Sequence, residues 1–175
     1  MTALSRKALE EHQVKRLREM LQPVLETNEF YRKKLLKNGA LKIDTLEQLK
    51  ELPFTTKSEL VQDQLDHPPF GTDLTYPLER YIRVHQTSGT TGKPLYWFDT
   101  ETDWQWWAEC WKVIFDAAGV GPEDRIYFAF SFGPFIGFWS GWEGARKVGA
   151  LAISGGGQST SQRLKAIIDY RATVV

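Results

Sequence analysis

The segment whose residue types could do chemistry spans residues 87–94 and reads Thr-Ser-Gly-Thr-Thr-Gly-Lys-Pro. Its two glycines let the backbone turn tightly and direct N–H groups at an anion. Short hydroxyl side chains add donors, and one lysine adds a point charge on a long stem. This combination suits a polyphosphate. The predicted phosphate-binding residues are Thr87, Ser88, Gly89, Thr90, Thr91, Gly92 and Lys93.

This segment is not the P-loop of nucleoside triphosphatases, in which the glycines lie further apart and the lysine leads into a helix. Here Pro94 follows the lysine, and residues 95–98 favour a strand. A strand is also predicted over residues 81–86, just before the segment. A hairpin turn rich in serine, threonine and glycine is therefore the alternative interpretation of the same residues.

The residues ahead of these strands favour helices. Apolar residues recur at helical spacing over 4–25, where Pro23 is expected to kink or end the helix. Further helices are predicted over 26–38, 44–52 and 57–65. Thr56 and Glu59 form a capping box at the start of the last one.

The residues after the loop alternate between helices and strands. Thr100 and Asp103 form a capping box, and the helix that follows carries a stripe predicted to pack into the core: Trp104, Trp107, Trp111, Ile114, Phe115 and Ala118. Strands are predicted over 125–130, 150–154 and 172–175, with helices over 142–148 and 159–170 between them. Helical crossovers between short apolar strands predict an α/β fold with a parallel sheet. We expect a helical lead-in over residues 1–70 and the start of this βαβ layer over 71–175.

The composition narrows the classes of function. Among 175 residues, 22 basic side chains balance 22 acidic ones, which gives no electrostatic footprint for nucleic acid or an anionic membrane. The single cysteine, Cys110, excludes an internal disulfide and a cysteine-cluster metal site. We expect a cytoplasmic protein without a nucleic-acid or membrane partner. An apolar strand at 172–175 needs covered edges, so we expect the chain to be part of a longer protein.

Residues 87–94 resemble the phosphate loop of the adenylate-forming enzymes, the acyl-CoA synthetase and luciferase superfamily. The flanking sequence resembles one branch, the phenylacetate–coenzyme A ligases, and the resemblance extends from about residue 29 to residue 175. It is carried by residues 52–57 (LPFTTK), 69–71 (PFG), 83–86 (RVHQ), 132–133 (FG) and 154–157 (SGGG).

The resemblance implies the N-terminal part of an AMP-forming ligase that activates an aryl, phenylacetate-like carboxylic acid through an acyl-adenylate. ATP, Mg²⁺ and coenzyme A would be its cofactors or substrates, and a homodimer is its expected assembly. Residues 71–175 would be the first part of the AMP-binding domain. The resemblance also makes Phe132, Phe135 and Gly137 candidates for the acyl pocket. Neither a catalytic residue nor a metal ligand is assigned within this chain, and the isolated chain is expected to be inactive.

Several alternatives stay open at this point. The chain could be a noncatalytic remnant or assembly module that retains the loop, or it could belong to an adenylating enzyme with another acyl acceptor. His85, just before the loop, is either near a ligand or held by a structural hydrogen bond. Phe128 and Phe130 are predicted to lie in the sheet core.

Overall fold

The computed structural model describes residues 5–36, 39, 41–89 and 93–175. They form two compact units, Met1–Arg80 and Tyr81–Val175, which we describe separately. Within the described ranges, no helix is both long enough and apolar enough to cross a bilayer.

The first unit is helical, as the sequence predicts. It contains α1 (Arg6–Thr27), α2 (Glu29–Leu35), η1 (Leu46–Glu51), α3 (Lys57–Asp66) and η2 (Leu78–Arg80). The α1 helix continues through Pro23 to Thr27, so this proline does not end the helix. The α2 helix is shorter than predicted because Asn28 interrupts the helical run: it is both the C-cap of α1 and the N-cap of α2.

Asn28 also ties the junction of α1 and α2 to a distant segment of the same unit. Its side chain is buried, and its Nδ2 donates to the Asp73 carbonyl at 2.6 Å and to Thr75 Oγ1 at 3.1 Å. Its Oδ1 accepts from the backbone N–H of Tyr31 at 3.0 Å. A buried amide whose donors and acceptor are all used in this way fixes the path of the chain on both sides of it.

The Asp73 side chain lies in a partly buried site beside a second carboxylate. Burial, together with the nearby charge of Asp63, raises the pKa of Asp73 to about 6. Asp63 accepts from both the backbone N–H and the hydroxyl of Thr72, each at 2.6 Å. This pair of hydrogen bonds holds the Asp63 carboxylate in place near Asp73.

The second unit begins with an antiparallel hairpin of β1 (Tyr81–Gln86) and β2 (Tyr96–Thr100). The β2 strand runs directly into α4 (Glu101–Ala117). Thr100 is both the last residue of the strand and the N-cap of the helix. Its N–H donates to Asp103 Oδ2 at 2.9 Å, while Asp103 N–H donates to Thr100 Oγ1 at 3.3 Å, so the predicted capping box is confirmed.

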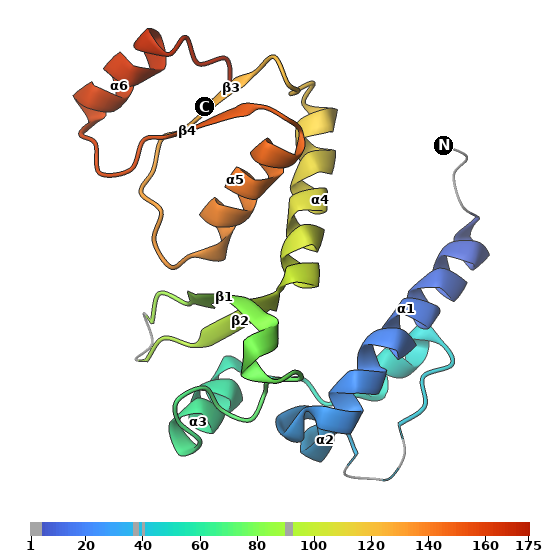
Figure 1. Ribbon diagram of the computed structural model, residues 1–175. Helices are drawn as coiled ribbons and strands as arrows, with labels where there is room; N and C mark the ends of the chain where they lie inside the picture. Colours follow the sequence, from blue (N-terminus) through green and yellow to red (C-terminus); the bar gives the residue numbers. More distant parts are fainter. Residues whose placement is uncertain (1–4, 37–38, 40, 90–92) are drawn as a thin grey trace. The chain divides into compact units, whose positions relative to one another are not determined.

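The rest of this unit is a βαβ layer (Figure 1). Strands β3 (Arg125–Phe128) and β4 (Leu151–Ser154) pair in parallel, and α5 (Ile136–Lys147) connects them. Helix α6 (Thr160–Asp169) follows, and Val174 forms a parallel bridge to Ile126 in β3. The predicted α/β class with a helical start and a parallel sheet is confirmed.

Two predictions about the helices of this unit were wrong. Helix α5 begins at Ile136, whereas the sequence predicts a start near residue 142, so the aromatic stretch after β3 is partly helical. In α4 the buried residues are Trp104, Ala108 and Phe115, while Trp107 is 39% and Ile114 is 53% exposed. The buried positions are spaced by four and then seven residues, which places them on one face of the helix, and Trp107 and Ile114 lie to one side of that face.

The core of the second unit lies where α4 crosses α5. A Cβ added to Gly144 of α5 would lie 2.2 Å from the Cβ of Trp111 in α4 and 3.2 Å from the Phe115 ring. The two helices therefore contact each other at a point where only hydrogen fits. Phe128 and Ala145 are buried in the same cluster, with Phe130 packed against it, which confirms the predicted core position of both phenylalanines.

Replacing Gly144 with alanine should destabilise the second unit, since the new methyl group overlaps Trp111 and must push the helices apart. We expect the free energy of unfolding to fall by about 1–3 kcal/mol in chemical denaturation. Gly137→Ala is the matched control on the same helix, because no atom lies within 4 Å of the added Cβ. Equal stability of the two variants would contradict the close contact.

Asp73→Asn should increase stability at neutral pH. The raised pKa means that the native carboxyl group keeps its proton between pH 3.8, the ordinary pKa of an aspartic acid, and about pH 6, whereas the unfolded one loses it over this range. This contribution to stability is complete below pH 4 and is lost as the pH rises through 6.

The advantage of Asp73→Asn over the unsubstituted protein should therefore grow from pH 4 to pH 7, to the order of 1 kcal/mol, allowing for the partial solvent exposure of the site. Urea unfolding at both pH values measures it, with the exposed Asp66→Asn in α3 as the control. A difference that does not change with pH would show that Asp73 is ionised in the native protein at pH 4.

Candidate functional site

The predicted phosphate loop connects the two strands of the β1–β2 hairpin. Thr87 and Leu95 close its stem: the Thr87 N–H donates to the Leu95 carbonyl at 3.0 Å, and the Leu95 N–H donates to Thr87 Oγ1 at 3.0 Å. Leu95 is 2% exposed, so this end of the loop is anchored in the unit. The hairpin geometry matches the alternative interpretation of the sequence, and it places Thr87 at the end of the hairpin.

Within this loop the structure describes Thr87, Ser88, Gly89 and Lys93. Thr90, Thr91 and Gly92 lie outside the described residues. Ser88 and Lys93 are exposed, and Gly89 has a φ of +67°, a conformation that favours glycine. The loop thus offers a hydroxyl, an ammonium group and a left-handed backbone position next to an anchored stem.

A cavity of about 460 Å³ adjoins the loop stem on the second unit. Most of its wall is aromatic or aliphatic, and within the part of the chain that the structure describes no lysine or arginine lines it. It is lined by His85, Gln86, Thr87, Trp97, Phe98, Asp99, Trp107, Phe135, Ile136 and Gly137. The cavity therefore brings together the first residue of the predicted phosphate loop and two of the three acyl-pocket candidates.

The third candidate, Phe132, lies elsewhere. Its ring packs against Trp139 with centroids 4.7 Å apart, against Trp142 at 5.3 Å and against Phe128 at 6.0 Å. It does not line this cavity. Its contacts instead link the start of α5 to the aromatic core of the unit.

A backbone hydrogen bond joins the loop stem to the segment that carries Phe135. The N–H of Gln86, the last residue of β1, donates to the carbonyl of Pro134 at 3.0 Å. Phe135 is the N-cap residue of α5, and Gly137 lies in the first turn of that helix. The β1–β2 hairpin and the start of α5 are thus directly connected beside the cavity.

The titratable residues of the cavity wall are His85 and Asp99. Both side chains are buried, and His85 Nε2 lies 3.6 Å from Asp99 Oδ2. Burial lowers the pKa of His85, opposed by the Asp99 charge and the Pro134 carbonyl. Burial raises the pKa of Asp99, opposed by the His85 charge and a hydrogen bond from Trp107. Burial thus favours the neutral form of each group, whereas the charge of its neighbour favours the charged form.

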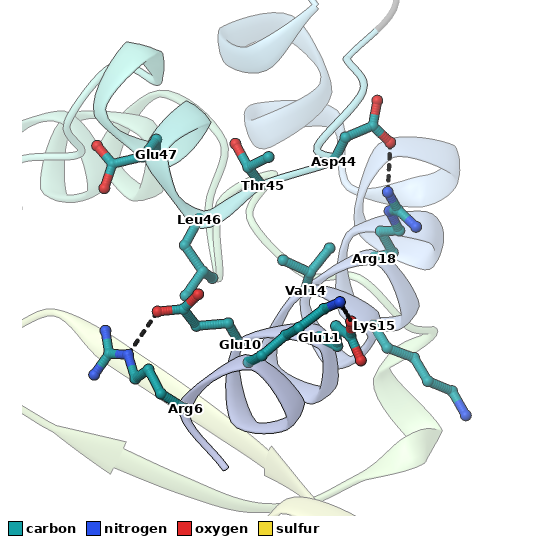
Figure 2. Close-up of a pocket in the computed structure, with 11 residues that line it drawn as sticks. Arg6, Glu10, Glu11, Val14, Lys15, Arg18, Asp44, Thr45, Leu46 and Glu47 are labelled. Carbon is teal, nitrogen blue, oxygen red and sulfur yellow. Dashed lines mark hydrogen bonds and ion pairs between the residues drawn. The ribbon is translucent and has the colours of Figure 1, made fainter.

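A second cavity, of about 520 Å³, lies on the first unit between α1 and the start of η1 (Figure 2). Its lining is rich in charge, but the charges pair with one another: Arg6 bonds Glu10 at 2.6 Å, and Arg18 bonds Asp44. These pairs are exposed to solvent, so their charges are already balanced and screened and add little to the binding of a ligand. Across the described ranges, no three histidine, cysteine or acidic side chains gather as a metal site.

Known proteins resemble this chain in sequence and in fold. No family model matches the chain. Phenylacetate–coenzyme A ligase of Escherichia coli K12 is 34% identical over 165 residues, 93% of this chain, and the Pseudomonas putida enzyme of the same name is 32% identical over the full chain. The chain is homologous to the phenylacetate–coenzyme A ligases. It spans 37% and 39% of the length of these two homologues, as expected for an N-terminal portion of such a ligase.

Solved structures of a related ligase share the fold. A crystal structure of 2-hydroxyisobutyryl-CoA ligase in an open conformation, in complex with 2-HIB-AMP and CoA, superposes with a TM-score of 0.84. It is 27% identical, and the match covers 96% of this chain and 40% of that one. The same ligase in its thioesterification state gives a TM-score of 0.85 at 29% identity. The two units of this chain therefore have the fold found in a ligase of the adenylate-forming family.

Sequence reasoning did not assign six residues of the cavity wall to a site: Gln86, Trp97, Phe98, Asp99, Trp107 and Ile136. The pairing of β1 with β2 could have indicated Trp97 and Asp99. Asp99 lies opposite Arg83 and Trp97 lies opposite His85, so these four side chains lie on one face of the hairpin. Trp107 was assigned to the core on its helical spacing. It lies at the edge of the buried face of α4, where one side of the ring lines the cavity.

Thr87→Val should weaken the stem of the loop. Valine has the same shape but no hydroxyl, so the buried Leu95 N–H would lose its acceptor, at a cost of about 1–3 kcal/mol in the free energy of unfolding. The exchange of the Leu95 amide with solvent measures the effect. Thr87→Ser keeps the hydroxyl and serves as the control. Unchanged Leu95 exchange in Thr87→Val would exclude the role of this hydrogen bond.

Proposed function

We propose that the protein carrying this chain is an AMP-forming acid–coenzyme A ligase for an aromatic carboxylic acid. The acid's carboxylate would attack the α-phosphorus of ATP, giving an acyl-adenylate and pyrophosphate. The thiol of coenzyme A would then displace AMP and form the thioester. The observation that carries the proposal is the position of Thr87, the first residue of the predicted loop, in the wall of a largely aromatic cavity, in a chain homologous to ligases of this kind.

The first step requires positioning and charge neutralisation rather than a general base, because a carboxylic acid is already ionised at neutral pH. Ser88 and Lys93 would bind phosphate oxygens, and the backbone at Gly89 would approach them closely. The proposal extends this role to Thr87, Thr90, Thr91 and Gly92. Lys93 is the one side chain of the loop whose charge opposes the negative charge of the departing pyrophosphate.

The cavity would hold the aryl group of the acid. Trp97, Trp107 and Phe135 offer ring faces and edges to a flat aromatic substrate, and Gly137 leaves space at the start of α5. Phe132 would support this wall from behind through its contact with Trp139. The absence of lysine and arginine from the wall suits the apolar end of the acid, while its carboxylate would face the loop.

Magnesium would arrive with ATP as the counter-ion of its phosphates. The described residues form no three-ligand acidic or histidine cluster, so the fit is that of a metal–nucleotide complex bound through the nucleotide. Loop hydroxyls such as that of Ser88 are suited to such a complex. We also propose that residues 71–175 are the first part of the AMP-binding domain, in a cytoplasmic homodimer.

Lys93→Ala, made in the protein at its natural full length, should reduce acid-dependent exchange of pyrophosphate into ATP by about 100-fold or more, since the charge that balances the pyrophosphate is lost. Lys165→Ala is the control: Lys165 is exposed and pairs with Asp169 on α6, away from the loop. Activity of Lys93→Ala within twofold of the unsubstituted protein would remove the loop from the mechanism.

The same assay separates the alternatives. A protein without acid-dependent exchange would be a remnant or an assembly module. A protein that exchanges pyrophosphate but forms no thioester with coenzyme A would be an adenylating enzyme with another acceptor.

A further inference from the structure

A group of buried polar atoms lies between α4 and the β1–β2 hairpin that carries the phosphate loop. Arg83 and His85 on β1, Asp99 on β2 and Trp104 on α4 form this group, which we call the His85 cluster. Within the described residues, five of its side-chain atoms make no hydrogen bond of good geometry: Arg83 Nε, His85 Nδ1 and Nε2, Asp99 Oδ2 and Trp104 Nε1. So many in one place need an explanation, because buried polar atoms are nearly always paired.

The cluster is well packed in spite of these unpaired atoms. The His85 ring stacks on the Trp104 ring with centroids 5.4 Å apart and an interplanar angle of 23°. The Arg83 guanidinium lies 4.8 Å from the centre of the same ring and 3.5 Å from a Glu143 carboxylate oxygen. His85 is 5% exposed. Shape complementarity is therefore present, and only the polar pairing is incomplete.

Packing gives no reason for histidine at this position. A phenylalanine could stack on Trp104 without burying two ring nitrogens that make no hydrogen bond of good geometry. What histidine adds is a polar ring beside an acceptor, since Asp99 Oδ2 lies 3.6 Å from Nε2. The Pro134 carbonyl opposes the lowering of the ring's pKa by burial.

Pro134 connects the strand that leads into the phosphate loop with the segment that carries Phe135 of the cavity wall. Its carbonyl accepts the N–H of Gln86, which immediately precedes the phosphate loop, and its chain continues into Phe135 of the cavity wall. His85 therefore stands beside the one backbone hydrogen bond, among those of the described residues, that ties the end of β1 to this segment.

We propose that His85 is a positioning residue: with Asp99 and Trp104 behind it, it fixes the Gln86–Pro134 contact and so sets the placement of the phosphate loop relative to the aryl cavity. This rests on the proposed function, in which the loop holds ATP and the cavity holds the acid. A positioning role affects the reaction between the two substrates more than the binding of either, because small misplacements of reacting groups cost rate.

The test uses His85→Phe and His85→Gln in the protein at its natural full length. For His85→Phe we expect kcat of the pyrophosphate exchange to fall about 100-fold, with the KM for ATP within about twofold. Its unfolding midpoint should be unchanged or higher, because two unpaired nitrogens are removed. His85→Gln restores a side chain that can donate to Asp99 or Pro134 and should recover about tenfold of the lost rate.

Trp106→Phe, an exposed position on α4 outside the cluster, is the matched aromatic control. The proposal is overturned if His85→Phe retains kcat within about twofold, or if its loss of activity follows a lower unfolding midpoint.

A second measurement does not depend on the reaction. In His85→Phe the Gln86 amide should exchange with solvent faster, by about tenfold, while the Leu95 amide, held by Thr87, should not change. If the unsubstituted protein shows no pyrophosphate exchange, the proposed function fails and this measurement still decides the role of His85. Unchanged Gln86 exchange would overturn the positioning role, and faster exchange would support it.

Discussion

The contact of Gly144 with Trp111 determines how the second unit is built. Because no side chain separates the helices there, α5 lies against α4, and the residues on either side of the contact are placed by it. Helix α4 continues from β2 through Thr100, so the position of α4 determines where the hairpin lies. Helix α5 begins at the aromatic segment after β3, so the position of α5 determines where Phe135 lies. The cavity lies between the hairpin, α4 and the start of α5.

Much of this arrangement could be predicted from local sequence signals. The capping box at Thr100 and the hairpin strand over residues 81–86 depend on a few neighbouring residues, and the structure confirms both. The start of α5 could not be predicted in this way, because its first residues, Ile136 to Trp139, are glycine and bulky apolar side chains of modest helix propensity. Packing against the aromatic core, through Phe138 stacked on Phe130, stabilises the helix there.

The candidate site shows the same division between local and tertiary information. The loop motif is local, and the prediction of a phosphate ligand depends on these neighbouring residues alone. The cavity depends on side chains brought together from β1, β2, α4 and α5. Trp107 shows why helical spacing was insufficient to predict the cavity wall. It lies three residues from the buried Trp104, so the spacing assigns both to the core, but Trp107 is displaced around the helix and lines the cavity.

The bridge between Ile126 and Val174 has a consequence for the order in which the chain can fold. Strand β4 follows β3 after one crossover helix, whereas Val174 lies 48 residues from its partner, and its carbonyl accepts the N–H of the fully buried Tyr127. Closing a longer loop costs more entropy, so β3 pairs first with β4 on one edge. During synthesis the other edge of β3 stays unpaired until Val174 has left the ribosome. Until then a strand that is central in the finished sheet is an edge strand, open to mispairing.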